Sequence, residues 1–102
     1  HGSVITGTAD DDNAFGLSVS IAGSGNRVAI GSPRHNGGRG RACVYGIEND
    51  NWVRLVDDTH GQEPNDHEGH SVSMSVDGKI VAIGAPATGT TRSGSAAVYR
   101  IL

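Results

Sequence analysis

Apolar and small residues alternate near the start of the chain, where Leu17, Val19 and Ile21 are each followed by a serine or an alanine. A period of two is typical of a β-strand that buries one face. The glycine-rich segment 23–26 then favours a tight hairpin, because glycine accepts the positive φ that such turns require. In this half of the chain, strands are predicted over residues 17–22, 27–31, 41–47 and 52–56.

The same pattern occurs a second time. The segment Ser18-Val19-Ser20 returns 53 residues later, and so does Val28-Ala29-Ile30-Gly31. Val44-Tyr45 of the third strand returns after 54 residues, so the second copy has one extra loop residue. In the second copy, strands are predicted over residues 70–76, 79–84 and 95–101, with no counterpart of 52–56.

A repeat of this length in a strand-rich chain predicts an all-β fold of two four-stranded antiparallel propeller blades. Residues 1–55 would hold an N-terminal closing strand and the first blade, and residues 56–102 the second blade. The fourth strand of the second blade would come from the N-terminal strand of a neighbour. Because two blades cannot close a ring, we expect either a homo-oligomer or the remaining blades of a larger propeller as partners. The alternative is a compact sandwich in which the two copies cover each other. The expected core consists of Val19, Ile21, Val28, Ile30, Val44, Val72, Met74, Val81, Ile83 and Val98.

The composition of the chain indicates how its sheets pack and which partners it can have. Large aromatic side chains are few, with one Phe, one Trp and two Tyr against 16 Gly, which favours thin sheets packed closely together. The net charge is −3 and the basic residues are scattered, so we expect no nucleic-acid partner. No apolar run approaches the ~20 residues of a membrane span, so we expect no membrane insertion. The single cysteine, Cys43, aligns with Ala97 and is expected to be buried as a small apolar residue.

Both copies carry motifs that resemble the FG-GAP repeat family, known from the β-propellers of integrin α subunits. Phe15-Gly16 with Ser18-Val19 matches the opening motif, and Ile30-Gly31-Ser32-Pro33 is a variant of Gly-Ala-Pro. In the second copy Gly84-Ala85-Pro86 matches outright, whereas Glu68-Gly69 replaces Phe-Gly. The resemblance implies a non-enzymatic adhesion or ligand-binding role and an extracellular or cell-surface location.

The chain departs from the calcium-binding members of that family. Their first hairpin carries an Asp-rich loop, whereas here the first hairpin has no carboxylate and the second has only Asp77. A calcium ion takes six to eight oxygen ligands. We therefore predict no metal site in these hairpins and no cofactor. No paired acid and base stands at a defined spacing, so the chain is not predicted to be an enzyme.

The polar loop 34–40 is the best candidate for ligand contact. Its residues Arg34, His35, Asn36 and Arg39 could hold a carboxylate or a sugar through guanidinium groups. Trp52 is the fifth candidate, as a platform on which a sugar stacks. The plainer interpretations are a solvated loop and a tryptophan that covers the blade edge. A carbohydrate-binding, lectin-like propeller is therefore the alternative function.

Two clusters raise the question of a metal ion. The acidic run at residues 10–13 precedes the first strand, and we interpret it as a solvated connection with turn-capping side chains. His60, His67 and His70 with Asp66 have the donor types of a zinc site but lie on strand and loop, without a defined tetrahedral arrangement. His70 aligns with Leu17, so we expect it to point inward as a partnered core histidine.

Overall fold

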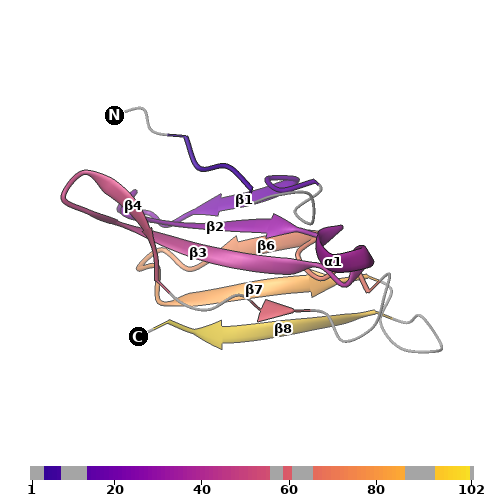
Figure 1. The fold of residues 1–102 in the computed structure, drawn as a ribbon. Coiled ribbons are helices and arrows are strands. Elements are labelled where there is room, and N and C mark those ends of the chain that lie inside the picture. The colour runs from indigo at the N-terminus through magenta and orange to yellow at the C-terminus, as the bar shows by residue number, and fades with distance from the viewer. Residues whose placement is uncertain (1–3, 8–13, 56–58, 61–65, 87–93, 102) are drawn as a thin grey trace.

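The computed structural model describes residues 4–7, 14–55, 59–60, 66–86 and 94–101, which form two antiparallel β-sheets (Figure 1). The first sheet has the strand order β1 (Ser18–Ile21), β2 (Arg27–Ser32), β3 (Arg41–Glu48) and β4 (Asn51–Arg54). The two-residue β5 (Thr59–His60) also pairs with β3. The second sheet has the order β6 (Ser71–Met74), β7 (Ile80–Ala85) and β8 (Ser95–Arg100). The prediction of an all-β chain is confirmed.

The repeat in the sequence is also a repeat in strand pairing. Ser18 pairs with Gly31 between β1 and β2, and Ser71 pairs with Gly84 at the same place between β6 and β7. Likewise Ile30 pairs with Cys43, and Ile83 with Ala97. Each copy therefore contributes a three-stranded unit with one register, and the first sheet is extended by β4 and by β5.

The only helix in the described residues is α1 (His35–Gly38), a single turn in the connection between β2 and β3. Asn36 and Gly37 within it have φ values of 53° and 69°, which are left-handed rather than helical. The segment is therefore a tight turn, in agreement with the predicted loop. No helix of the described residues has the length and apolar character needed to cross a membrane.

The second sheet lies against one face of the first, with β6 in contact with β1 and β2. The cluster between the sheets joins Ala29, Ala42 and Val44 of the first sheet to Val81 and Ile83 of the second. Val81 and Ile83 are the repeat counterparts of Val28 and Ile30, which point to the opposite side of β2 from Ala29 because side chains alternate along a strand. The two units therefore stack head to tail, through faces that are not equivalent.

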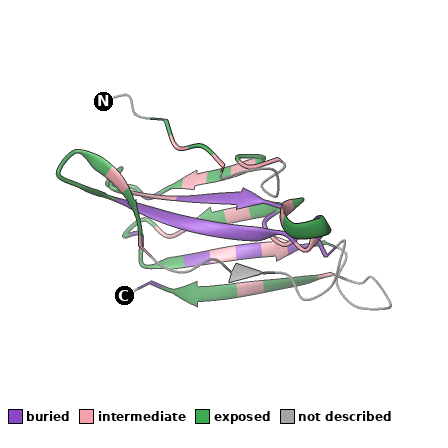
Figure 2. Ribbon diagram, in the orientation of Figure 1, coloured by how far each residue is buried: buried purple, intermediate pink, exposed green. Residues whose placement is uncertain are grey.

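Each face of the first sheet carries an apolar cluster at its centre. Its other face carries a second cluster of Ile30, Cys43 and Tyr45, on which Ile5, Phe15, Val28 and Trp52 pack. As a result, every residue from 41 to 46 in β3 is buried, as Figure 2 shows. Cys43 is fully buried, as expected from its small apolar counterpart Ala97.

Most of the predicted core is correct, but three members are wrong. Ile30, Val44, Val81 and Ile83 are buried, and Val28, Val72 and Met74 are partly buried against the two clusters. Val19, Ile21 and Val98 are instead 63%, 60% and 69% exposed. These three side chains lie on the outer faces of the two-sheet stack, which no other described element fully covers.

Small side chains and hydroxyls set the register between the two sheets. The Ser18 hydroxyl donates a hydrogen bond to the Gly69 carbonyl over 2.8 Å, and the Ser20 hydroxyl accepts one from the Met74 amide over 3.0 Å. Gly31 makes this approach possible, because a Cβ at that position would collide with the Gly69 carbonyl. At the far end of the strands, the Arg27 guanidinium donates to the Gly78 carbonyl over 2.8 Å.

The N-terminal segment is described over residues 4–7, where it has no regular secondary structure. Ile5 packs on the second cluster of the first sheet. In the described residues, β8 pairs only with β7, whereas its counterpart β3 pairs with β2, β4 and β5. The outer edge of the second sheet is therefore open in this part of the chain.

Candidate functional site

Four of the five residues predicted to contact a ligand lie on the connection from β2 to β3. The consecutive left-handed residues Asn36 and Gly37 fold this loop back on itself, and the Gly40 amide donates to the His35 carbonyl over 3.0 Å. Arg34 and Asn36 are exposed, whereas His35 and Arg39 are half-buried. The loop thus presents a guanidinium and an amide to solvent at one end of the sheets.

The segment that leads into β6 lies directly beside this loop. The amides of His67 and Glu68 donate to the carbonyls of Gly38 and Arg39 over 2.8 and 3.1 Å. Glu68 also forms a parallel bridge with Gly40, where any side chain would collide with the Glu68 backbone. The second copy is therefore held against the polar loop of the first by main-chain hydrogen bonds.

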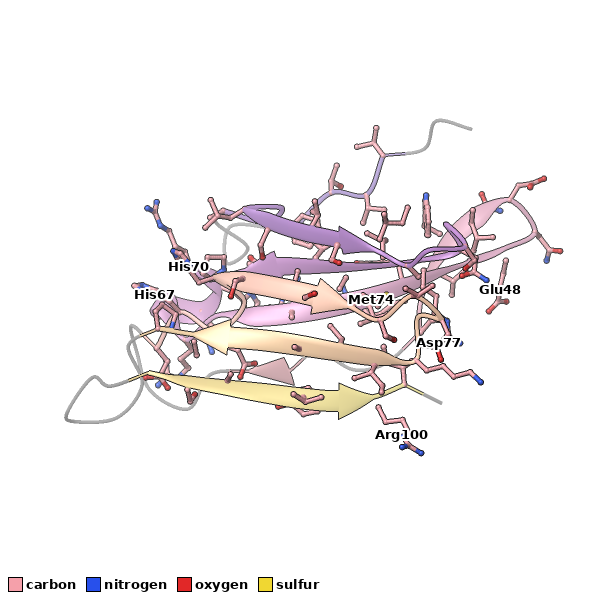
Figure 3. The ribbon with its side chains drawn as sticks, turned by 180° about the vertical axis from the view of Figure 1, so that it is seen from behind. Glu48, His67, His70, Met74, Asp77 and Arg100 are labelled. Atoms are coloured by element: carbon pink, nitrogen blue, oxygen red, sulfur yellow. The ribbon has the colours of Figure 1, made fainter. Side chains whose placement is uncertain are left out.

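This contact brings His67 and His70 close to Arg34. Together with Leu17 and Pro33 they line a depression of about 190 Å³ at the loop end of the molecule. Figure 3 shows His67 and His70 at this end, on the segment before β6. The depression combines one permanent cation, two imidazoles and an apolar wall. It is smaller than the ~300–1,000 Å³ usual for drug-sized ligands, so it suits a carboxylate group or a single sugar ring.

The expectation that His70 would point inward is wrong, because His70 is exposed. Its counterpart Leu17 is also 58% exposed, and both residues line the same depression. Head-to-tail stacking places equivalent positions of successive units side by side. The repeat offset was the sequence signal that could have grouped Leu17 with His70.

Trp52 is not brought together with the loop residues. It pairs with Ile47 near the far end of β3 and packs against the second cluster of the first sheet. Arg41, at the loop end of β3, is six residues from Ile47, which corresponds to about 20 Å along a strand. A ligand held by Arg34 and His70 is therefore out of reach of the Trp52 ring.

The metal-binding residues considered from the sequence do not form a cluster in the described part of the chain. There, no three His, Cys, Asp or Glu side chains are grouped as metal ligands. Asp66 is buried, with 3% exposure, while His70 faces solvent. The acidic residues at 10–12 and the side chain of His60 lie outside the described residues.

A second, larger depression lies at the opposite end of the strands and was not predicted from the sequence. It has a volume of about 520 Å³ and is lined by three cationic side chains, one carboxylate and two isoleucines: Arg27, Lys79, Arg100, Asp77, Ile80 and Ile101. Figure 3 shows Asp77 and Arg100 at this end, away from His67 and His70. Five of the six residues belong to the second copy, and Arg27 of the first sheet joins them because the two hairpins stack.

Asp77 is fixed within its hairpin. Its Oδ1 accepts hydrogen bonds from the Ser75 hydroxyl at 2.7 Å and from the Lys79 amide at 3.0 Å. These bonds, that from Ser75 first, hold the pKa of Asp77 below its usual value. The carboxylate is thus already engaged, and the depression beside it carries a surplus of positive charge.

Comparison with known proteins does not place the chain in a family. No protein-family model matches it, and no curated protein matches its sequence.

Proposed function

We propose that this chain is a non-enzymatic binding or scaffold module that forms part of a β-propeller, either by oligomerisation or together with the remaining blades of a larger protein. The observation that carries the proposal is the head-to-tail stacking of two repeat-related sheets. In such a stack every unit uses one face for the unit before it and the other face for the unit after it. Two units alone leave one face of each kind open.

The residues that carry the FG-GAP resemblance support the same interpretation. Gly31, in the variant of the Gly-Ala-Pro motif, accommodates the Gly69 carbonyl, and Ser18 of the opening motif donates to that carbonyl. Gly40, before the closing Val-Tyr, accommodates Glu68. These motif residues act in contacts between units rather than in a reaction. On the same resemblance we propose an extracellular or cell-surface location, with ligands bound at the loop end.

Tandem copies of the chain test the propeller proposal. Two or three copies joined by a flexible Gly/Ser linker would stack through their open faces, and the melting temperature would rise with copy number. Each Val or Ile that becomes fully buried adds about 1.5–3 kcal/mol, so the rise would be several degrees. A matched tandem with Val98→Asp in its first copy keeps the linker but places a charge at the junction. If both tandems melt at the temperature of the single chain, the units are independent and the proposal is wrong.

Carbohydrate binding is the second candidate, favoured by the depression that contains Arg34, His67 and His70. A glycan array would be probed with the wild type, Arg34→Ala, His70→Ala and Trp52→Ala. Loss of a sugar signal in the first two variants, with retention in Trp52→Ala, would locate the sugar at the loop end. Loss in Trp52→Ala alone would locate it on β4. An array with no signal removes the lectin alternative.

A further inference from the structure

The outer face of the second sheet has the same composition as a face that is already occupied. The face of the first sheet that binds the second sheet consists of Ser18, Ser20, Ala29, Gly31, Ala42 and Val44. On the outer face of the second sheet, the counterparts of these six residues are Ser71, Ser73, Ala82, Gly84, Ala96 and Val98. Val44 is 3% exposed and Val98 is 69% exposed, so the same residue type stands in two environments. The difference is the presence of a neighbouring sheet.

The outer face of the first sheet is equivalent to the other side of that interface between the sheets. It carries Val19 and Ile21, which are 63% and 60% exposed. Their counterparts Val72 and Met74 are partly buried in the cluster between the two sheets. The two ends of the stack therefore present the two halves of an interface that already exists inside the chain.

We propose that the outer face of the second sheet binds the outer face of the first sheet of a second copy of this chain, in the register that the two sheets use within one chain. This inference rests on the proposed function and names its partner. When the hydrogen bonds between the two sheets of one chain are repeated between two copies, each of these bonds has a definite donor and acceptor. The Ser71 hydroxyl donates to the Gly16 carbonyl of the second copy, and the Ser73 hydroxyl accepts from its Ile21 amide.

Gly84 supports this register. At Gly31 a Cβ would collide with the Gly69 carbonyl of the neighbouring unit, whereas at Gly84 it would meet only Ser71 of the same sheet. In the described residues, therefore, no neighbouring main chain takes the space that Gly84 leaves. The Gly16 carbonyl of the second copy fits that space, as the Gly69 carbonyl fits the space over Gly31.

The arginine at the hairpin end is also retained. Arg27 pairs across the strands with Gly46, and at the equivalent place Ile80 pairs with Arg100. The arginine has moved from one strand of the pair to the other but remains on the same face. Arg27 donates to the Gly78 carbonyl, so Arg100 would donate to the Gly25 carbonyl of the second copy.

The open edge of β8 receives its partner in the same arrangement. Within the chain, Thr59 pairs with Ala42 and His60 pairs with Arg41. The counterparts of these four residues are Thr6, Gly7, Ala96 and Ser95. Thr6 and Gly7 of the second copy would therefore pair with the outer edge of β8.

Two charge substitutions and their mixture test the interface. Val19→Asp spoils only the outer face of the first sheet, and Val98→Asp spoils only that of the second. Both positions are largely exposed, so each variant should keep its β-sheet circular dichroism spectrum. Asn51→Asp, on the exposed end of β4, adds the same charge away from both faces. Sedimentation velocity would be measured from micromolar to millimolar concentration.

We expect the mass of the wild type and of Asn51→Asp to rise with concentration to at least twice the 10.5 kDa of one chain. Each Asp variant alone should stay at the mass of one chain. An equal mixture of the two should form a dimer, because the intact outer face of each variant meets the intact outer face of the other.

Three results would overturn the inference. The wild type could remain a folded monomer at every concentration, or neither Asp variant could weaken association. In the third case the mixture would stay at the mass of one chain, which would show that the two intact outer faces do not bind each other. If the free chain is a monomer but the tandem copies are stabilised, only the inference about a second copy fails. If the tandem copies are not stabilised either, the proposed function fails with it.

Discussion

Substituting alanine for Gly31 and, separately, for Gly84 gives a direct measure of the contact between the sheets. The two glycines occupy the same position of the repeat and pair with serines in the same register. Neither has a positive φ, so alanine strains the backbone at neither position. The difference between them is that a Cβ at Gly31 meets the main chain of the neighbouring unit, whereas at Gly84 it meets a side chain that can rotate.

The expected cost can be worked out from these contacts. Overpacking at Gly31 costs about 1–3 kcal/mol, and loss of the bond from Ser18 to the Gly69 carbonyl costs about 0.5–1.5 kcal/mol. Replacing a strand glycine by alanine returns about 0.5–1 kcal/mol. The net loss for Gly31→Ala is therefore about 2 kcal/mol, a fall in melting temperature of roughly 8–16 °C. In Gly84→Ala the only cost is the rotation of the Ser71 side chain, and the gain from replacing a strand glycine offsets this cost. The free energy of unfolding should therefore be unchanged or slightly higher.

Urea denaturation followed by circular dichroism would measure both variants at low concentration, where association does not contribute. The slope of the unfolding free energy against urea should be unchanged, since neither substitution alters the surface that unfolding exposes. Equal destabilisation by the two substitutions would show that the sheets do not approach each other at Gly31, and would refute the reasoning.

The remaining predictions use other parts of the molecule. Ile83→Ala should destabilise the chain by about 2–5 kcal/mol, because Ile83 is 3% exposed between the sheets. Val98→Ala should change the stability of the dilute chain by about 0.5 kcal/mol or less, because Val98 is 69% exposed. Equal effects of the two substitutions on urea denaturation would contradict the assignment of faces. Gly84→Ala should weaken self-association while leaving the dilute chain stable, as sedimentation would show. Carboxyl NMR should find the pKa of Asp77 below its ordinary value of 3.8, and Ser75→Ala should raise this pKa, because the Ser75 hydroxyl is its main cause. Since the folded pKa is the lower one, the carboxylate stabilises the hairpin above the ordinary value, and this contribution is lost as the pH falls through the folded pKa; a pKa that Ser75→Ala leaves unmoved would count against the hydrogen bond. Thermal melts with calcium and with chelator should coincide, because the hairpins lack the carboxylates that calcium needs, and a shift of several degrees would contradict this.

The strands could be predicted from the sequence because the alternation of side chains and the glycine turns are local properties. Which face of each strand is buried could not be predicted from the sequence. Val19 and its repeat counterpart Val72 both read as core residues, yet Val72 packs between the two sheets while Val19 is mostly exposed. Which side of a strand is covered depends on where the next sheet lies, and no spacing within one strand reports that position.

The candidate site shows the same division. Arg34, His35, Asn36 and Arg39 were found because they share one loop. His67 and His70 reach the same place through the hydrogen bond from the His67 amide to Gly38, which local patterns do not reveal. Trp52 was grouped with the loop by residue type, although β3 separates them. The 53-residue offset between the copies, applied to single residues, pairs His70 with Leu17 and was the sequence signal for this grouping.

The hydroxyls of Ser18 and Ser20 bond to the main chain of the following unit, not to its side chains. A carbonyl or an amide is present whatever side chain its residue carries, so these two hydrogen bonds do not depend on the side chains of the docking segment. The two copies can therefore carry different side chains on either side of Gly69 and keep these hydrogen bonds. Glu68 stands where the first copy has Phe15, and His70 stands where it has Leu17. The loop end is thus a surface on which the two copies carry different side chains, while the hydrogen bonds beneath it are made by the main chain.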